Sequence, residues 1–498
     1  MSWISSTWGK CDAALDKVGV HLVLLCGTLA LMLLLAPHWG MWLSNSDDPW
    51  ITRQSLSEVF QTASAQGRFW LIPINLMAQL PYKAGSWELA NLIKILVNGA
   101  TVAAFVVFCS KATDLKTGLL VGCVWLAFID VSPGYYSPFH GFLLMFNLQF
   151  AVMFLSFAWF LHKQAQGDGR VVLGPYLLFA FSLLAYEPML FYAGVFPALA
   201  WMRQDAERRS LRALPDFVLT WMRQNFVLVL VVLGYIVVYY VYRHFQPAPG
   251  RSIDFDGAWS AILKTIYRFS VYGFHLETAA TKSYVAGYTL LSDLQWAVAY
   301  GLLLAGCFAV LMPRVHFFET LAAPQRYGVL LLIAFYIFAP NVLHGFVESY
   351  RQWAADDPHY VGNYMSSFAL ALLLAVLLIL LAGSARARRE PALYVLCTFL
   401  VFSSAVDNHL RWRQLSSVNR ADAMLWQKAI ADLRRGAIAA SDKPVLICGK
   451  HSPEKVSGDD RYWSDSLSEQ LGRRVQFRSK NLQSLACDVT IEFNDYRF

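Results

Sequence analysis

The sequence predicts an all-α polytopic membrane protein that ends in a small soluble α/β domain. Of its 498 residues, 57% are hydrophobic and 15% are charged, and the mean hydropathy is +0.42. A soluble globular protein is far less apolar than this. The apolar residues form runs long enough to cross a hydrocarbon core of about 30 Å, and these runs stop near residue 407. We therefore expect a transmembrane domain over residues 1–407 and a soluble domain over residues 408–498.

The apolar runs predict about 11 transmembrane helices. The run Val171–Met202 is too long for one span, and Glu187-Pro188 interrupts it, so we expect two short spans that meet at Tyr186-Glu187-Pro188. No small-residue cleavage site follows the first run, so we expect this run to be a span and not a signal peptide. The other expected spans are Val18–Ala36, Leu89–Cys109, Thr117–Asp130, Phe139–Leu161, Phe226–Tyr242, Leu294–Met312, Tyr327–Leu343, Asn363–Ala382 and Ala392–Ala405.

The distribution of charge predicts the orientation. The net charge is +7, but the basic residues are spread over short loops, which favours a role in topology and contact with anionic lipid over nucleic-acid binding. With the N-terminus in the cytoplasm, the densest basic loops, Arg203–Arg223 and Ser384–Glu390, are cytoplasmic as well. The C-terminal domain then lies outside, on the face that also receives the acidic residues at the membrane edge: Asp47, Asp48, Asp130 and Glu187.

The first outer loop carries the strongest candidate site. Asp47 and Asp48 follow the first span, and Ile51–Ala65 has apolar residues at the spacing of a helix that lies at the membrane interface. Arg68 follows this helix, and the planar fork of a guanidinium can bind two oxygens of a lipid phosphate. The alternative, that Asp47 or Asp48 only caps the interfacial helix, remains open.

Glu187 and two later loops complete the outer face. A carboxylate at the junction of two spans is costly unless it faces a cavity or a cation, although a structural hydrogen bond to another helix is an alternative. The loop from residue 243 to 293 is too long for a connector, and we expect Trp259–Tyr272 to form a second interfacial helix. Basic and aromatic residues in both loops suit a phosphate and a sugar ring, although a solvated loop with a salt bridge is equally compatible; they include Tyr272, His275, Arg351, His359 and Tyr360.

These motifs resemble those of the GT-C superfamily of membrane glycosyltransferases. DDPW at Asp47–Trp50, GRFW at Gly67–Trp70 and YEP at Tyr186–Pro188 are similar to the arrangement in bacterial serotype-converting glucosyltransferases and in related enzymes that modify O-antigen or pilin. The resemblance covers roughly residues 47–360. It implies a bacterial inner-membrane enzyme that moves a single sugar from a polyprenyl-phosphate donor to a cell-surface glycan or pilin. His359-Tyr360 stands where some relatives carry Arg-Tyr, so Arg351 is an alternative phosphate ligand.

The resemblance also implies roles for the site residues. Asp47 or Asp48 is the expected general base, Arg68 is expected to neutralise the leaving phosphate, and Glu187 is expected to orient the acceptor or the sugar. Direct displacement would invert the anomeric centre. No nucleotide-binding motif is visible, and we expect no required cofactor, although the acid pair would also suit Mg²⁺ or Mn²⁺. The further residues expected to contact the phosphate or to line the substrate site are Arg351, His359 and Tyr360, and Trp50, Tyr186, Tyr272 and His275.

The pattern of the C-terminal region predicts an α/β domain. We expect an amphipathic helix at Asn419–Arg435, strands at Pro444–Cys448, Arg474–Phe477 and Asp488–Phe493, and a helix at Asp465–Leu471. If this domain lies in an oxidising compartment, Cys448 and Cys487 at the strand ends can form a disulfide. The five cysteines within apolar runs, Cys26, Cys109, Cys123, Cys307 and Cys397, have no metal-binding spacing and are expected in the core.

Two other functions remain as alternatives. A transporter or flippase for lipid-linked sugars would show inverted repeats with paired broken helices at the midplane, and no repeat is apparent. A ligase of the O-antigen type would need a dominant outer loop with several arginines late in the chain, which the loop at 243–293 fits only loosely.

Overall fold

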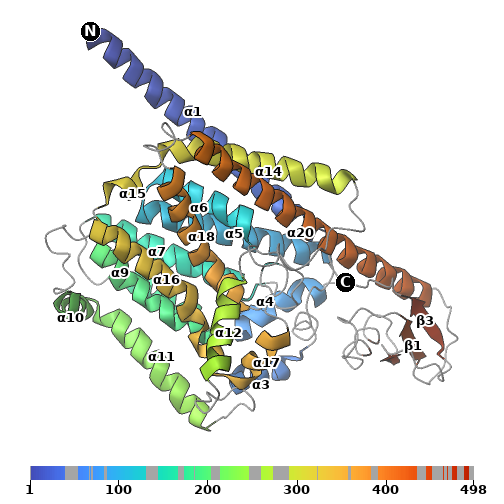
Figure 1. Cartoon of the computed structure of the whole chain (residues 1–498). Coiled ribbons are helices and arrows are strands. Elements are labelled where there is room, and N and C mark those ends of the chain that lie inside the picture. Colours follow the sequence, from blue (N-terminus) through green and yellow to red (C-terminus); the bar gives the residue numbers. More distant parts are fainter. Residues whose placement is uncertain are drawn as a thin grey trace.

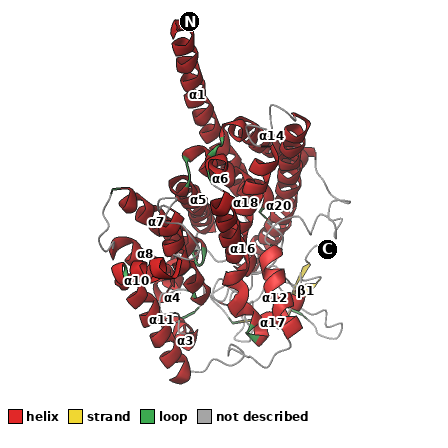
Figure 2. Cartoon of the chain, turned by 60° about the vertical axis from the view of Figure 1, so that its left-hand side comes forward, coloured by secondary structure: helices red, strands yellow, loops and turns green. Residues whose placement is uncertain are grey.

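The computed structural model shows a helical bundle followed by a small sheet (Figures 1 and 2). It describes residues 2–39, 54–66, 68, 71–83, 87–129, 139, 144–166, 173–183, 186–202, 214–245, 259–272, 291–321, 323–356, 361–382, 391–434, 445–450, 464, 468, 474–478 and 487–492.

Six helices in this part of the chain are long and apolar enough to cross a membrane. A seventh span results if α10 (Leu214–Gln224) and α11 (Phe226–Phe245), which meet at 88°, cross as one bent unit. The predicted total of about 11 is therefore not confirmed. The six helices are α1 (Ser2–Leu35), α5 (Trp87–Ala112), α14 (Leu291–Leu311), α16 (Ala323–Gly345), α18 (Val361–Ala382) and α20 (Pro391–Arg434).

Several expected spans are short helices. α6 (Leu115–Phe128) has 14 residues, which gives about 21 Å at 1.5 Å per residue against a hydrocarbon core of about 30 Å. The interrupted run forms α8 (Leu173–Leu183), the 3-10 helix η2 (Glu187–Gly194) and α9 (Val195–Met202), so the predicted change of element next to Glu187 is confirmed. α7 (Asn147–Ala165) is longer, with 19 residues, and the remaining short elements are α15 (Phe317–Thr320), η1 (Ala36–His38) and η5 (Met312–Arg314).

Aromatic packing holds the centre of the bundle together. Trp125 of α6 stacks on Phe368 of α18 at 5.3 Å, and its indole nitrogen donates to the Ser367 hydroxyl at 3.0 Å. Phe105 of α5 and Phe154 of α7 meet Phe368 edge to face, each at 4.9 Å. Because lipid tails are as apolar as these side chains, close packing and interhelical hydrogen bonds, more than transfer from water, favour this association.

The short helices near one end of the bundle lie away from the N-terminus of α1 (Figure 1). They are α3 (Leu56–Gln66), α4 (Leu71–Lys83), α12 (Trp259–Val271) and α17 (Glu348–Asp356). The predicted helix at Trp259–Tyr272 is confirmed as α12. The predicted helix at Ile51–Ala65 is shorter than expected, since α3 begins after Ser55. Ser55 and Glu58 bond reciprocally, the Ser55 N–H to the Glu58 carboxylate at 2.7 Å and the Glu58 N–H to the Ser55 hydroxyl at 3.3 Å, a capping box that starts the helix here.

α20 joins the bundle to the C-terminal sheet. The expected span Ala392–Ala405 and the expected helix Asn419–Arg435 are parts of this one helix, because no Gly or Pro interrupts the chain between Pro391 and Arg434. The expected domain boundary at residues 407 and 408 therefore lies inside α20.

Three strands follow α20 and pair in parallel in the order β2-β1-β3. The predicted strands are confirmed as β1 (Val445–Lys450), β2 (Val475–Arg478) and β3 (Val489–Glu492). The predicted disulfide between Cys448 and Cys487 is present, and it ties β1 to the start of β3. Most of the expected helix Asp465–Leu471 lies outside the described residues.

The close contact between α5 and α6 predicts that a larger residue at Gly118 lowers stability. A Cβ atom added at Gly118 of α6 would lie 2.6 Å from the Ser110 backbone nitrogen and 2.8 Å from its Cα, which are part of α5. Since backbone atoms cannot move aside as a side chain can, we expect Gly118→Ala to destabilise the protein by about 1–3 kcal/mol. Gly306→Ala in α14 is the matched control, because nothing lies within 4 Å of its added Cβ. Thermal unfolding in detergent measures both, and equal melting temperatures for the two variants would contradict the packing of α5 on α6.

Candidate active site

Arg68 is held by the backbone between two helices. Its N–H donates to the Ala63 carbonyl at 2.9 Å, and its own carbonyl accepts from the Leu71 N–H at 2.9 Å at the start of α4. A bond from a residue to the carbonyl five positions earlier closes a helix in the Schellman motif, in which glycine commonly precedes the donor. Gly67 precedes Arg68 in the sequence. The bond from Arg68 therefore ends α3 and fixes the backbone from which the guanidinium extends.

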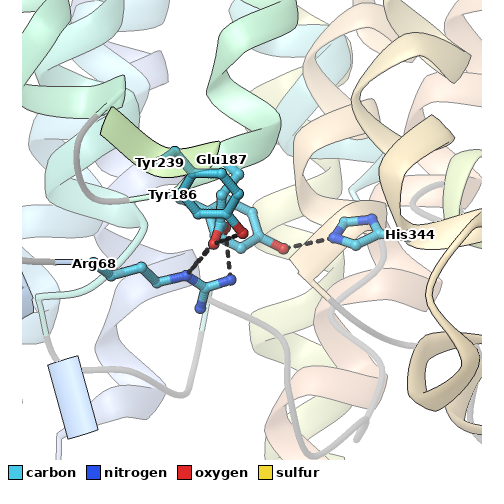
Figure 3. Close-up of polar contacts among 5 residues, drawn as sticks. All are labelled: Arg68, Tyr186, Glu187, Tyr239 and His344. Carbon is cyan, nitrogen blue, oxygen red and sulfur yellow. Dashed lines mark hydrogen bonds and ion pairs between the residues drawn. The ribbon is translucent and has the colours of Figure 1, made fainter. Parts of the chain in front are cut away.

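The Arg68 side chain forms a buried ion pair with Glu187 (Figure 3). Nε lies 3.0 Å from each carboxylate oxygen, and Nη2 lies 2.7 Å from Oε2. Only 9% of the Arg68 side chain and 11% of the Glu187 side chain are exposed. The Tyr239 hydroxyl of α11 donates to Glu187 Oε1 at 3.1 Å. Glu187 is therefore held by two separate elements as well as by its place at the start of η2.

The ion pair keeps Arg68 charged. Burial acts to lower the pKa of Arg68, but the attraction of Glu187, with smaller contributions from Tyr350, the hydrogen bond to Glu187 and Tyr186, raises this pKa well above its ordinary value. The guanidinium is therefore a permanent cation in a site almost closed to solvent. A cation so placed interacts with an anionic group more strongly than one in water does.

Tyr186 connects this pair to a second polar group. The Arg68 guanidinium carbon lies 4.9 Å from the centre of the Tyr186 ring, within the range of a cation–π interaction. The Tyr186 hydroxyl is 2.6 Å from His344 Nε2, and His344 Nδ1 is 2.9 Å from Asn341 Oδ1 (Figure 3 shows the first of these bonds). Both His344 and Asn341 lie on α16 and are fully buried.

Phe146 supports Tyr186 from α7. Its ring meets the Tyr186 ring edge to face at 4.9 Å. It precedes α7 with a φ of 69°, the one positive φ at a non-glycine residue in the described part of the chain. Such a conformation is costly for a bulky residue and persists where the surroundings impose it, often at functional sites. This strain indicates that the wall behind Tyr186 is held in place by the fold.

The structure brings together three of the expected site residues: Arg68, Tyr186 and Glu187. Arg351 lies on α17, where its Nη1 donates to the Gly345 carbonyl at 3.2 Å, and Tyr272 follows the last turn of α12. The expected residues Asp47, Asp48, Trp50, His275, His359 and Tyr360 lie outside the described residues.

Sequence reasoning missed Tyr239, Asn341 and His344. Asn341 lies within the expected span Tyr327–Leu343, and His344 follows it directly, so a polar pair at the end of an apolar run was an available signal. Tyr239 carried no such signal, because tyrosine is common near the ends of membrane helices.

Metal ligands do not cluster in the described part of the chain, where no group of three or more His, Cys, Asp or Glu side chains is placed to hold an ion. The acid pair Asp47 and Asp48, which suited Mg²⁺ or Mn²⁺ in the sequence, lies outside that part. The structure therefore does not test whether this acid pair binds a metal ion.

An apolar cavity of about 130 Å³ lies elsewhere in the bundle. Its lining includes Tyr192 of η2, which stacks on Tyr336 of α16 at 5.5 Å, and it continues past Phe105 and Phe157 to Phe317 and Phe318. Almost all of its wall is hydrocarbon or aromatic ring. A cavity of this chemistry suits an apolar chain and not a sugar.

Comparisons with known proteins give weak similarity to solved structures. No protein-family model matches the chain, and no curated protein matches it. Among solved structures, ArnT from Cupriavidus metallidurans bound to undecaprenyl phosphate aligns with 92% of this chain and 86% of its own, at 14% identity and a TM-score of 0.34. These values are too low to assign a fold or a function, and we base neither on them.

The buried ion pair predicts a large difference between single and double substitutions. Glu187→Gln leaves the Arg68 charge buried without its carboxylate, so we expect a loss of about 3–5 kcal/mol of stability. Arg68→Met combined with Glu187→Met removes both charges, and we expect a much smaller loss. Thermal or denaturant unfolding in detergent provides the measurement. A double variant that is as unstable as Glu187→Gln would show that the pair is not the source of the effect.

Proposed function

We propose that the protein is a membrane glycosyltransferase of the GT-C type that transfers one sugar from a polyprenyl-phosphate donor to an acceptor outside the cytoplasm. The observation that carries this proposal is the buried Arg68 guanidinium, held by Glu187 and Tyr186 next to the end of α16 and between two short helices. A rigid cation at the end of a membrane helix suits a phosphate that is anchored in the bilayer by its lipid.

The Arg68 guanidinium can donate hydrogen bonds to more than one partner. It carries five N–H donors, and the bonds to Glu187 engage Nε and Nη2. We assign Arg68 to the donor phosphate. Glu187, which was expected to orient the acceptor or the sugar, is assigned instead to hold Arg68 in the correct orientation, because its bidentate contact fixes the plane of the guanidinium.

The proposed reaction is a single displacement at the anomeric carbon. The acceptor hydroxyl oxygen forms a bond to this carbon, the bond from the carbon to the phosphate oxygen breaks, and polyprenyl phosphate leaves with the electron pair. Asp47 or Asp48 accepts the hydroxyl proton as general base. Arg68 stabilises the negative charge that develops on the leaving phosphate. The anomeric configuration is inverted, and no nucleotide or redox cofactor is needed.

The proposed location is the bacterial inner membrane, with the N-terminus in the cytoplasm and the C-terminal sheet in the periplasm. The Cys448–Cys487 disulfide supports this orientation, because disulfides form and persist in oxidising compartments. Polyprenyl-linked sugars serve acceptors on that side, such as cell-surface glycan or pilin.

A transporter of lipid-linked sugars is the second candidate. It would need two related half-domains with broken helices that face each other at the midplane. The described helices include one strongly bent pair, α10 and α11. A transporter would move the intact donor across the membrane of a vesicle without producing free polyprenyl phosphate, so product analysis separates the two functions.

The proposed orientation makes a prediction about two cysteines. In a variant that retains only Cys448 and Cys487, we expect a membrane-impermeant maleimide to label intact spheroplasts only after reduction, because the thiols are joined in the periplasm. A gel shift with a large maleimide reports the labelling. Labelling that requires disruption of the membrane, with or without reduction, would place the sheet in the cytoplasm and contradict the proposed topology.

The proposed mechanism makes a prediction about activity. With synthetic polyprenyl-phosphate sugars and a glycan or pilin acceptor, we expect Arg68→Gln to lower kcat/KM by roughly 100-fold or more, the usual effect of removing a group that stabilises the transition state. Asp47→Asn or Asp48→Asn should lower kcat by roughly 100- to 10,000-fold at the residue that acts as the base.

Arg413→Gln serves as the matched control. Arg413 Nε binds Asp293 Oδ1 at 2.7 Å and joins α20 to α14, two helices that contribute none of the described site residues. We expect the control to transfer sugar at close to the wild-type rate. Wild-type rates for Arg68→Gln, Asp47→Asn, Asp48→Asn and Glu187→Gln together would rule out the enzymatic role of these residues.

A further inference from the structure

His344 occupies a hydrogen-bond chain whose direction can be deduced from Asn341. The Asn341 Nδ2 atom lies 3.0 Å from the Phe269 carbonyl and 3.3 Å from the Gly362 carbonyl. Two backbone carbonyls require a donor at this position, since an amide oxygen here would face other oxygens. The amide oxygen of Asn341 therefore points to His344.

The serine hydroxyls around Asn341 support this orientation. Ser366 Oγ donates to the Ile337 carbonyl at 2.7 Å and lies 2.8 Å from Asn341 Nδ2, from which it can only accept. Ser270 Oγ lies 3.1 Å from the same nitrogen. The Asn341 amide thus gathers α12, α16 and α18 through its nitrogen and leaves its oxygen for the imidazole.

The protonation of His344 follows from this arrangement. Because Asn341 Oδ1 accepts at 2.9 Å, His344 Nδ1 carries a hydrogen. In the neutral imidazole the other nitrogen is then an acceptor, so the Tyr186 hydroxyl donates to His344 Nε2 at 2.6 Å. The rings of Phe269 and Tyr350 meet the imidazole edge to face, at 5.6 and 4.7 Å, and fix its plane.

The backbone of α18 is shaped to fit this chain. A Cβ atom added at Gly362 would lie 2.1 Å from Asn341 Oδ1 and 3.1 Å from its Cγ. Only glycine at this position lets the first turn of α18 reach the Asn341 side chain. The bonds continue past Asn341 through its amide nitrogen, but a primary amide does not release a proton near neutral pH, so we assign no proton relay to this chain.

We propose that His344 is a positioning residue for the phosphate-binding arginine: held by Asn341, it accepts from the Tyr186 hydroxyl and so fixes the ring against which the Arg68 guanidinium lies. This inference rests on the proposed function, in which Arg68 binds the donor phosphate. The proposed role requires that the side chain at position 344 present a hydrogen-bond acceptor to Tyr186 and a donor to Asn341. It does not require an ionisable group.

Glutamine at position 344 tests this requirement, because its amide offers an acceptor and a donor but cannot titrate. The probe is farnesyl phosphate, and its Kd is measured with the full-length protein in lipid nanodiscs from pH 5.5 to 8. We expect His344→Leu and Tyr186→Phe each to raise Kd roughly five- to tenfold. We expect His344→Gln to stay within about threefold of wild type, with the same pH profile.

Two further comparisons sharpen the test. The double variant Tyr186→Phe with His344→Leu should bind no more weakly than the weaker single variant, because both remove the same contact. Tyr300→Phe and His409→Leu are matched controls. Tyr300 donates its buried hydroxyl to the Leu126 carbonyl at 2.7 Å, and buried His409 bonds to the Leu33 carbonyl at 3.1 Å, both on helices outside the site. We expect both controls to bind as wild type.

Wild-type affinity for farnesyl phosphate in both His344→Leu and Tyr186→Phe would overturn the proposal. A His344→Gln variant that binds as weakly as His344→Leu would overturn it too, since this result would require an ionisable imidazole. If His344→Leu does not fold, the pair Tyr186→Phe and His344→Gln decides, with only the first expected to weaken binding. Arg68→Gln separates this inference from the proposed function. If Arg68→Gln retains affinity, the phosphate assignment itself fails; if it loses affinity while Tyr186→Phe does not, only the role of His344 fails.

Discussion

The buried ion pair between Arg68 and Glu187 is the contact on which the arrangement of this end of the bundle depends. Removing two charges from water costs several kcal/mol for each ion, and only close geometry with further hydrogen bonds offsets this cost. Here the geometry is bidentate, and the Tyr239 hydroxyl adds a third donor to the carboxylate. The pair therefore constrains α3, η2 and α11 together, although these elements are distant in sequence. Such a pair is weak evidence for added stability but strong evidence for a defined geometry.

Around this pair, each neighbouring contact limits the movement of Arg68. The Ala63 carbonyl fixes its backbone, Tyr186 covers one face of its guanidinium, and Glu187 takes one edge. Behind Tyr186, the ring of Phe146 stands on a strained backbone. Polar side chains in a bundle of membrane helices are expensive and usually face one another. Their concentration at one end of the bundle, beside short helices, supports the proposed site for a lipid-anchored polar headgroup.

Much of the outline could be predicted from the sequence. Apolar runs located the long helices, because a span must satisfy its own backbone hydrogen bonds and present hydrocarbon to lipid. The interruption at Glu187-Pro188 was correctly placed, since a proline next to a carboxylate cannot continue an apolar helix. The predicted number of spans is not confirmed by the described helices. With 14 residues, α6 is shorter than a hydrocarbon core is thick. Most of its residues are buried against other helices, so its apolar composition reflects burial in protein as much as contact with lipid.

The sequence by itself determined that the chain is a membrane protein with a carboxylate at a helix break, an arginine after a short helix, and two cysteines near strand ends. These features are local, since each follows from the order of residues within about twenty positions. Only the tertiary structure decided that Arg68 and Glu187 are partners, and that Asn341, His344 and Tyr186 form one directed chain. Sequence spacing carries no information about the Arg68–Glu187 and Tyr186–His344 contacts, because each joins residues more than a hundred positions apart and depends on how distant elements pack.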